Sequence, residues 1–186
     1  MGILTVEQIV SADGYAADAS GGIDFFAAVD EPATTDTEQL QWLGGVDAIL
    51  LGGNTYRMFA GYWPGADPAV EPVAEVIARL PKYVFSNALD AAPWGDAELE
   101  VLHGDVAATI AELKGRHESI VVWGSLMLCD ELFRTGLVDE LRLRIVPVLI
   151  GAGRPFTPAD LGERRLALDH TVSHPSGHVG LHYRLR

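Results

Sequence analysis

The stretch that decides the fold is Asp47-Ala48-Ile49-Leu50-Leu51-Gly52-Gly53-Asn54-Thr55. A short, continuous apolar run that ends in glycine is typical of a strand buried on both faces of a sheet. The glycine pair makes a tight turn, and Thr55 opens a stretch with helical character. A second segment, Val121-Val122-Trp123-Gly124-Ser125-Leu126, repeats this order of strand, glycine and helix start. Together the two segments predict an α/β sheet with helices that begin at strand ends.

Apolar periodicity extends this pattern on both sides of the two segments. It predicts strands at Ile3–Val10, Asp47–Leu51, Lys82–Ser86 and Ser119–Trp123. It predicts helices at Pro32–Gly44, Pro72–Leu80, Asp105–Gly115 and Ser125–Thr135. The first helix has three candidate N-caps, Thr34, Thr35 and Asp36, and Asp105 is the candidate N-cap of the third.

The final third of the chain changes to a period of two. Residues 141–145 and 179–185 alternate apolar and polar side chains, which predicts half-exposed strands that pair antiparallel at one edge of the sheet. The segments Gly151–Arg165 and Thr171–His178 have the composition of loops. The sequence therefore predicts one domain over residues 1–186, with a mixed, mostly parallel sheet, helices on both faces and an antiparallel C-terminal edge.

Composition and charge exclude several classes of protein. The chain has 186 residues, 48% of them hydrophobic, which suits one folded domain and excludes global disorder. Its formal net charge of -13 repels phosphate backbones and anionic lipid, so nucleic acid and membrane surfaces are poor partners. Cys129 is the single cysteine, which excludes an intramolecular disulfide. The start Met1-Gly2-Ile3-Leu4 has no basic region or long apolar stretch, so we expect a cytoplasmic protein.

The two glycine turns are candidate anion sites. Glycine lets the backbone approach a ligand closely, and unpaired N–H groups at a helix N-terminus attract phosphate. A net-acidic protein can hold phosphate in this way without a basic surface. The alternative is that both turns are ordinary connections between strand and helix, because neither segment fits the dinucleotide fingerprint or the P-loop.

The other polar residues indicate fewer sites. His174, His178 and His182 have helical spacing, but the proline and glycines between them argue against a helix. On a strand, His178 and His182 would share a solvated face, so we expect no metal site. Glu7 and Gln8 lie in a predicted central strand, where polar side chains need partners or a ligand cavity.

Five segments occur in an order that points to a family. They are Ser11-Ala12-Asp13-Gly14-Tyr15-Ala16, Leu51-Gly52-Gly53-Asn54-Thr55-Tyr56, Val84-Phe85-Ser86-Asn87, Val122-Trp123-Gly124-Ser125 and the stretch Gly136–Gly153. Taken together they resemble the dihydrofolate-reductase-like superfamily, specifically the reductase domain at the C-terminus of the bifunctional riboflavin-biosynthesis deaminase/reductase. The last segment is the most specific. No deaminase domain fits in this length, so the chain looks like a stand-alone reductase-type domain.

The resemblance implies an NADPH-binding protein, usually a homodimer, that transfers hydride to a small, heterocyclic, pyrimidine- or pterin-like substrate. It implies cofactor contacts at Gly52, Gly53, Asn54 and Thr55 for phosphate or ribose, at Ser86 and Asn87 for the adenosine end, and at Gly124, Ser125, Leu126, Met127 and Leu128 for the pyrophosphate. We expect Gln8, Asp13, Phe25 and Trp123 to lie on the substrate side. Asp24 is the candidate proton donor, and the alternative for Asp24 is a solvated loop carboxylate.

The chain departs from this family at three positions. Many relatives have arginine where Gly53 and Asn87 stand, and a guanidinium suits the 2′-phosphate that distinguishes NADPH from NADH. Arg57 or Lys82 would have to replace these arginines, so NADH is a possible cofactor. Trp123 stands where riboflavin-pathway reductases usually have glutamate, which favours a flatter or more apolar heterocycle. The alternative function is a non-catalytic nucleotide- or pterin-binding module on the same fold.

Overall fold

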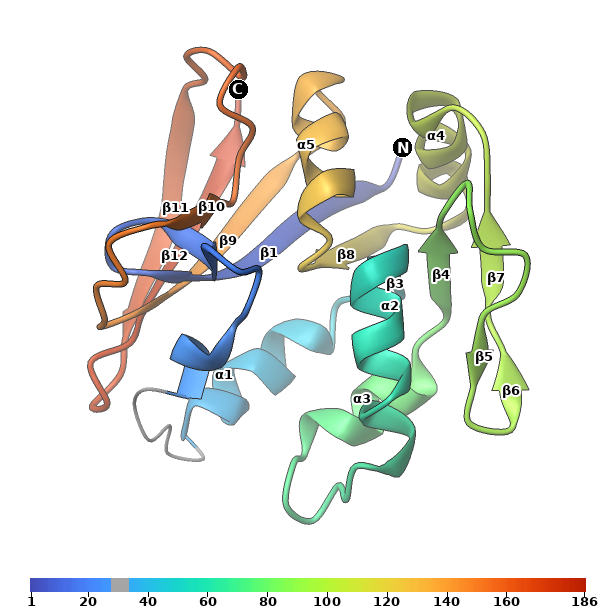
Figure 1. Cartoon of the computed structure of the whole chain (residues 1–186), viewed down its shortest axis with the longest axis horizontal. Coiled ribbons are helices and arrows are strands. Elements are labelled where there is room, and N and C mark those ends of the chain that lie inside the picture. The colour runs from blue at the N-terminus through green and yellow to red at the C-terminus, as the bar shows by residue number, and fades with distance from the viewer. Residues whose placement is uncertain (28–33) are drawn as a thin grey trace.

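One eight-stranded sheet forms the frame of the protein (Figure 1). The computed structural model describes residues 1–27 and 34–186. The strands of the sheet lie in the order β11-β12-β9-β1-β8-β3-β4-β7. Their bounds are β1 Ile3–Ser11, β3 Ala48–Gly52, β4 Lys82–Phe85, β7 Glu100–Leu102, β8 Ser119–Trp123, β9 Glu140–Val146, β11 Leu166–Ser173 and β12 Val179–Leu185. Two short ribbons lie outside this sheet: β2 (Tyr15–Asp18) with β10 (Gly153–Pro155), and β5 (Pro93–Trp94) with β6 (Ala97–Glu98).

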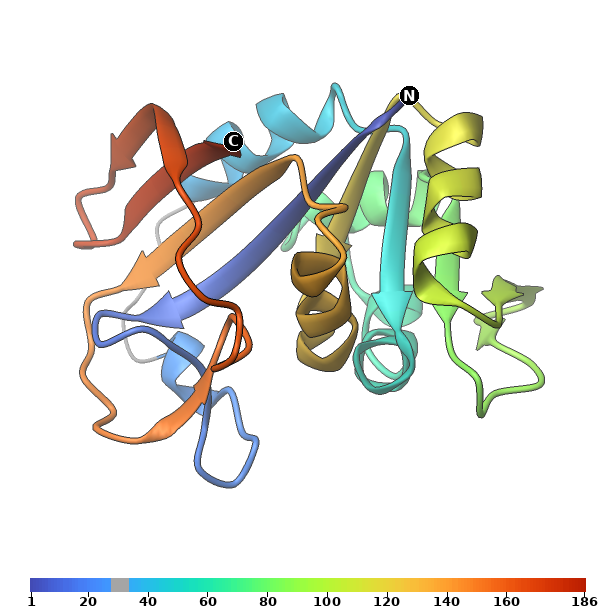
Figure 2. The ribbon, with the colours of Figure 1, turned by 90° about the horizontal axis from the view of Figure 1, so that it is seen from above.

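Helices cover both faces of the sheet (Figure 2). The apolar side chains of α1 (Thr34–Leu43) and α3 (Val73–Arg79) form one core, and those of α4 (Val106–Arg116) and α5 (Leu126–Arg134) form another on the opposite face. The helix α2 (Gly53–Ala60) begins directly where β3 ends, and two short 3₁₀ helices are η1 (Asp24–Ala27) and η2 (Trp63–Gly65). Within the described residues, no helix has the length and apolar composition needed to cross a bilayer.

Strand directions confirm the mixed sheet with an antiparallel C-terminal edge. The strands β9, β1, β8, β3, β4 and β7 each run parallel to their neighbours in this order. By contrast, β12 pairs antiparallel with β9, and β11 pairs antiparallel with β12. Residues 141–145 and 179–185 fall in β9 and β12, so their predicted antiparallel pairing is confirmed.

Where the structure describes a predicted helix start, the start agrees with the local sequence signal. The Asp105 carboxylate accepts a hydrogen bond from the Ala108 N–H at 2.9 Å, which is the N-cap contact expected for α4. The helix predicted over Pro32–Gly44 is α1. Its predicted start at Pro32, and the side chains of its candidate caps, lie outside the described residues.

The loop predictions for the C-terminal third are wrong in two places. Gly151–Arg165 contains β10, and Thr171–His178 contains the end of β11. Most β11 side chains are exposed because β11 is the outer edge strand, so its sequence lacks a buried apolar row. Backbone pairing with β12 makes this segment a strand, and composition alone does not report backbone pairing.

Candidate functional site

The two glycine turns meet at the carboxyl edge of the sheet. The strands β3 and β8 are parallel neighbours, so their ends at Gly52 and Trp123 lie at one edge. The Ser125 N–H donates to Oγ1 of Thr55 at 2.8 Å. The Ser125 hydroxyl accepts from the Gly52 N–H at 2.7 Å and donates to the Trp123 carbonyl at 2.8 Å. These hydrogen bonds hold the starts of α2 and α5 side by side.

Glycine at these turns has a steric reason. Gly124 has φ 53° and Ser125 has φ 56°, so two successive residues take the left-handed conformation, and Ser125 does so as an L-residue with a side chain. A Cβ atom on Gly124 would lie 3.1 Å from Oγ1 of Thr55. A Cβ atom on Gly53 would lie 3.3 Å from Oγ of Ser86, which brings the end of β4 against the start of α2. The turns are therefore closely packed around backbone.

Within the described residues, neither helix N-terminus is capped by a side chain. For α2, with Gly52 at the N-cap, and for α5, with Ser125 at the N-cap, no side chain of the described chain caps the first-turn N–H groups. Unpaired N–H groups and the partial positive charge of the helix end favour an anion. Two such ends, joined by the hydrogen bond between Ser125 and Thr55, form a candidate anion cradle built from backbone.

The other residues predicted for the cofactor lie around this cradle with different exposure. Asn54 is exposed and accepts from Arg57 at 3.0 Å, and Asn87 holds the Gly104 N–H at 2.7 Å. On α5, Leu126 is half-buried, Met127 is 79% exposed and Leu128 belongs to the core. Leu128 can therefore offer only its backbone to a ligand.

Lys82 lies away from this edge. It is the first residue of β4, at the opposite end from the glycine turns. Its ammonium donates to the carbonyls of Ile77 at 2.6 Å and Leu80 at 2.7 Å, where α3 ends. Burial lowers the pKa of Lys82, and the carbonyls hold its charge in place. Lys82 is therefore excluded as a substitute for the missing arginines, and Arg57 is the remaining candidate.

Gln8 and Trp123 do not converge. Side chains alternate along β1, so Gln8 points to the face covered by α5, whereas its neighbour Glu7 shares the other face with Trp123. The Gln8 amide donates to the Gly124 carbonyl and lies 3.5 Å from Sγ of Cys129. Gln8 therefore supports the glycine turn from inside the core.

The predicted residues of the first loop also have separate surroundings. Asp24 is exposed at the start of η1, and the ring of Phe25 packs against Phe26 with centroids 4.8 Å apart. The Asp13 carboxylate accepts from the Ser11 hydroxyl at 2.6 Å and from the Gly151 N–H at 2.7 Å. These hydrogen bonds, the Ser11 bond first, lower the pKa of Asp13 and keep it ionised. The Asp13 carboxylate is thus bound by Ser11 and Gly151 of the protein itself.

A buried polar cluster was missed by the sequence analysis. Glu7, Arg142 and His182 are aligned as Cα partners on the neighbouring strands β1, β9 and β12. The Arg142 guanidinium donates to Oε1 of Glu7 and to Oε1 of Glu38, each at 3.2 Å, and to Nδ1 of His182 at 2.9 Å. The expected solvated face is wrong for His178 and His182, which are 2% and 6% exposed. The need of Glu7 for a partner was the available signal.

Arg142 also disfavours a metal ion at Glu38, His170 and His182. Ligand atoms of these three residues lie within 4.8 Å of one another, a spacing compatible with a metal ion. A guanidinium can only donate, so Nδ1 of His182 must accept from Arg142 and the neutral ring carries its proton on Nε2. The Nε2 atom that carries this proton lies 3.5 Å from Oε1 of Glu38. Arg142 therefore supplies the positive charge beside Glu38, and the ring nitrogen that a metal would need is protonated.

We predict that His182 weakens the fold in mild acid. Burial, and next the charge of Arg142, lower the pKa of His182 from 6.5 to about 4. Between pH 6.5 and about pH 4, the unfolded chain therefore binds a proton at His182 that the folded protein does not bind. The stabilisation is fully present above pH 6.5 and is lost as the pH falls from 6.5 to about 4, with a slope of at most about 1.4 kcal/mol per pH unit.

Urea unfolding at about pH 7 and about pH 5 measures this loss. His182→Gln should flatten the pH dependence of the unfolding free energy, whereas His103→Gln, a change at an exposed histidine, should keep it. An equal pH dependence in the wild-type protein and in His182→Gln would contradict the assignment.

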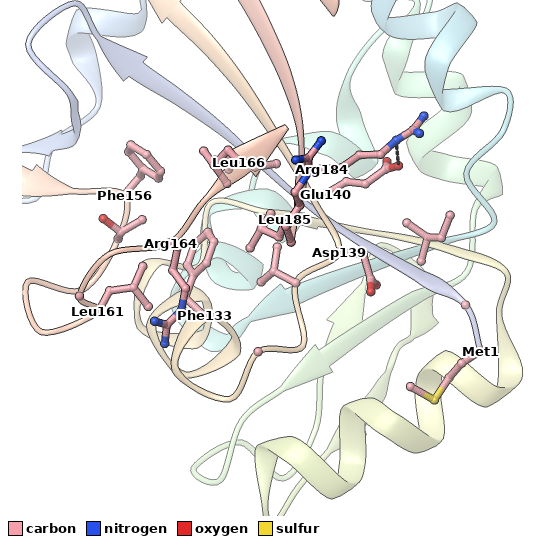
Figure 3. Close-up of a pocket in the computed structure, with 18 residues that line it drawn as sticks. Met1, Phe133, Asp139, Glu140, Phe156, Leu161, Arg164, Leu166, Arg184 and Leu185 are labelled. Carbon is pink, nitrogen blue, oxygen red and sulfur yellow. Dashed lines mark ion pairs between the residues drawn. The ribbon is translucent and has the colours of Figure 1, made fainter. Parts of the chain in front are cut away.

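A cavity of about 770 Å³ lies at the other end of the parallel strands, where β1 and β9 begin (Figure 3). Its lining includes Met1 and Ile3 at the start of β1, Phe133 at the end of α5, and Leu166 and Leu185 from the antiparallel strands. The start of β1 is the end of the sheet away from the glycine turns. The cavity is therefore separate from the candidate functional site.

Comparison with known proteins gives consistent matches. The model of the RibD C-terminal domain matches residues 3–179. YyaP of Bacillus subtilis is 27% identical over 184 residues, which cover 97% of this chain and 93% of YyaP. A Shewanella sp. PV-4 protein named for riboflavin biosynthesis has a TM-score of 0.81 at 22% identity, with 99% of both chains covered. Dihydrofolate reductase of Enterococcus faecalis, complexed with NADP(H), has a TM-score of 0.62 at 14% identity and covers 100% of this chain and 97% of its own.

Proposed function

Because the chain belongs to the RibD C-terminal domain family, we propose that it is a reductase that uses a nicotinamide dinucleotide, NADPH first and NADH as the possible alternative, to reduce a small heterocycle. The family supports a reductase-type enzyme, and its dihydrofolate-reductase-like fold is shared with an enzyme whose structure contains NADP(H). The proposed localisation is the cytoplasm.

The observation that carries this proposal is the anion cradle between α2 and α5. Two helix N-termini without side-chain caps lie next to each other, and glycines at 52, 53 and 124 let the backbones of the two turns pack closely against Ser125, Ser86 and Thr55. A pyrophosphate suits this arrangement, because backbone N–H groups can bind its oxygens even in a protein of net charge -13. The residues present therefore fit a dinucleotide.

Residues of this chain would hold the dinucleotide by its phosphates. The first-turn N–H groups of α2 and α5 would bind the pyrophosphate, and Ser86 would lie beside the adenosine end, next to Gly53. Arg57, exposed on α2, is the proposed partner of a 2′-phosphate. The dinucleotide supplies the hydride when it is bound, and the protein supplies orientation and electrostatics.

Aromatic side chains support a flat heterocycle as substrate. The ring centroids of Trp123 and Phe59 are 6.0 Å apart, and those of Phe59 and Trp63 are 5.9 Å apart, so the three rings form one cluster that starts at the end of β8, with Trp123 buried and the other two half-buried. Aromatic rings favour contact with planar, weakly polar ligands. Asp24, exposed on η1, stays the proposed proton donor.

The proposal is tested by two measurements on the purified protein. Oxidation of NADPH and NADH is followed with a panel of pterins, pyrimidines and quinones, and thermal unfolding is followed with each dinucleotide alone. We expect the dinucleotide to raise the unfolding temperature and at least one heterocycle to be reduced. Stabilisation without oxidation supports the alternative, a binding module, and no stabilisation by either dinucleotide overturns the proposal.

We also propose that the protein is a homodimer. The edge strand β11 exposes Leu166 and Leu168, at 41% and 58%, and Leu166 borders the cavity in Figure 3. The sequence predicts that residues 141–145 and 179–185 expose an edge or a face there, and in the structure the outermost strand of that edge is β11. An outer edge strand with exposed leucines beside an open cavity of mixed polar and apolar lining is a surface that a second copy would cover.

Sedimentation at micromolar concentration tests the assembly. We expect a species of twice 20.0 kDa that Leu168→Lys dissociates. Val70→Lys, a matched change at a side chain that is 74% exposed elsewhere, should leave it intact. A single species of 20.0 kDa in the wild-type protein would show that the chain is monomeric.

A further inference from the structure

The loops that follow β1 and β9 extend beyond the cradle. Glu7 is the Cα partner of Trp123, the last residue of β8, whereas β1 continues to Ser11, the Cα partner of Val146 on β9. Four further residues of strand correspond to about 13 Å. The loop that leaves Ser11 and the loop that leaves Val146 therefore form a wall beyond the edge where β8 ends and α5 begins.

One side chain joins the two loops of this wall. Oδ2 of Asp13 accepts from the Gly151 N–H at 2.7 Å, and Oδ1 accepts from the Ile150 N–H at 3.3 Å. The Ser11 hydroxyl donates to Oδ1 at 2.6 Å and accepts from the Tyr15 N–H at 3.0 Å. A single exposed carboxylate thus holds two amides of the other loop and is itself oriented from Ser11.

The ribbon below the loops supports this junction. A Cβ atom on Gly153 would lie 2.1 Å from the Ala17 carbonyl oxygen, so the pairing of β10 with β2 depends on glycine at this position. Arg154, the next residue of β10, forms an ion pair with Asp130 on α5. The ribbon therefore connects the two loops to the helix that begins at the cradle.

We propose that Asp13 is a positioning residue that locks the loops after β1 and β9 into one wall beside the nicotinamide half of the dinucleotide. The inference rests on the proposed function, in which the adenosine end lies beside Ser86 after β4. The nicotinamide half then extends to the other side of the cradle, toward β1 and β9. Asp13 thereby changes from a proposed substrate contact to a residue that holds the two loops together. Both oxygens of Asp13 are already engaged by the protein, so its carboxylate acts through the position of the loops.

The test compares Asp13→Asn with Asp160→Asn, a matched change at an exposed carboxylate that pairs with Arg134 at 2.9 Å. An asparagine side chain keeps the shape but replaces one carboxylate oxygen with an NH₂ group. Because the two amides bond to different oxygens of Asp13, one of them loses its acceptor. We expect faster hydrogen exchange at the amides of Ile150 and Gly151 only in Asp13→Asn. We also expect its affinity for NADPH to fall about tenfold, as for loss of a charged hydrogen bond.

Adenosine 2′,5′-bisphosphate, which lacks the nicotinamide half, separates positioning from general damage. Its affinity should be equal in the wild-type protein and both variants, because the wall lies beside the other half of the dinucleotide. Unchanged amide exchange in Asp13→Asn overturns the latch, and an equal loss of affinity for both ligands overturns its position beside the nicotinamide. If the wild-type protein binds neither ligand, the proposed function fails, and amide exchange alone then decides whether Asp13 holds the loops.

Discussion

Replacing Gly124 with valine is expected to abolish dinucleotide binding. At φ 53° a β-branched residue is strained, and the added Cβ would lie 3.1 Å from Oγ1 of Thr55 and 3.3 Å from its Cγ2. Relief of this contact requires Thr55 to move, which breaks its hydrogen bond with the Ser125 N–H. The cradle then loses its shape at the point where the phosphates would bind. Titration of NADPH and NADH into wild type and variant measures the loss.

The smaller variant Gly124→Ala keeps this test informative if valine prevents folding. It adds only the Cβ atom, and we expect binding at least about tenfold weaker, which corresponds to about 1.4 kcal/mol. Gly115→Ala is the matched control, because a Cβ atom there meets no atom within 4 Å and the position is helical. Alanine in a helix should raise stability slightly and leave binding unchanged. If Gly124→Ala binds both dinucleotides as tightly as wild type, the phosphate assignment is wrong.

Replacing Arg142 with methionine is expected to lower the free energy of unfolding by about 3–5 kcal/mol. Arg142 is 6% exposed and supplies the positive charge between Glu7 and Glu38, with its guanidinium 3.9 Å from the centroid of the Trp42 ring. Methionine keeps much of the side-chain volume but leaves the Glu7 carboxylate, whose side chain is 11% exposed, without its cation. Urea unfolding near pH 7 measures the difference.

Two further variants separate this ion cluster from ordinary surface pairs. Arg184→Met removes a guanidinium that pairs with Asp169 at 2.8 Å but is 64% exposed, and it should cost less than about 1 kcal/mol. Adding Glu7→Gln to Arg142→Met removes the unpaired charge, so the double variant should be less destabilised than the sum of the two single changes. Equal destabilisation by Arg142→Met and Arg184→Met would show that burial adds nothing to this cluster.

The order of strands and helices is the part of the fold that local signals report. Short apolar runs such as Asp47–Leu51 and Ser119–Trp123 become β3 and β8, because a strand covered on both faces needs apolar side chains at every position. Asp105 caps α4 as expected, since capping involves only the next turn. The edge strand β11 escapes such reading because its stability comes from pairing with β12.

The candidate site divides in the same way. Sequence by itself determined the two glycine turns, since a strand, a glycine and a helix start are neighbours along the chain, and parallel strands then bring the turns to one edge. Only the tertiary structure decided which charged side chains are bound by other parts of the protein. Lys82 is held by carbonyls at the far edge, and Asp13 is held by Gly151. Glu7 meets Arg142 across 135 positions of sequence, because that contact depends on strand register, which no local pattern encodes.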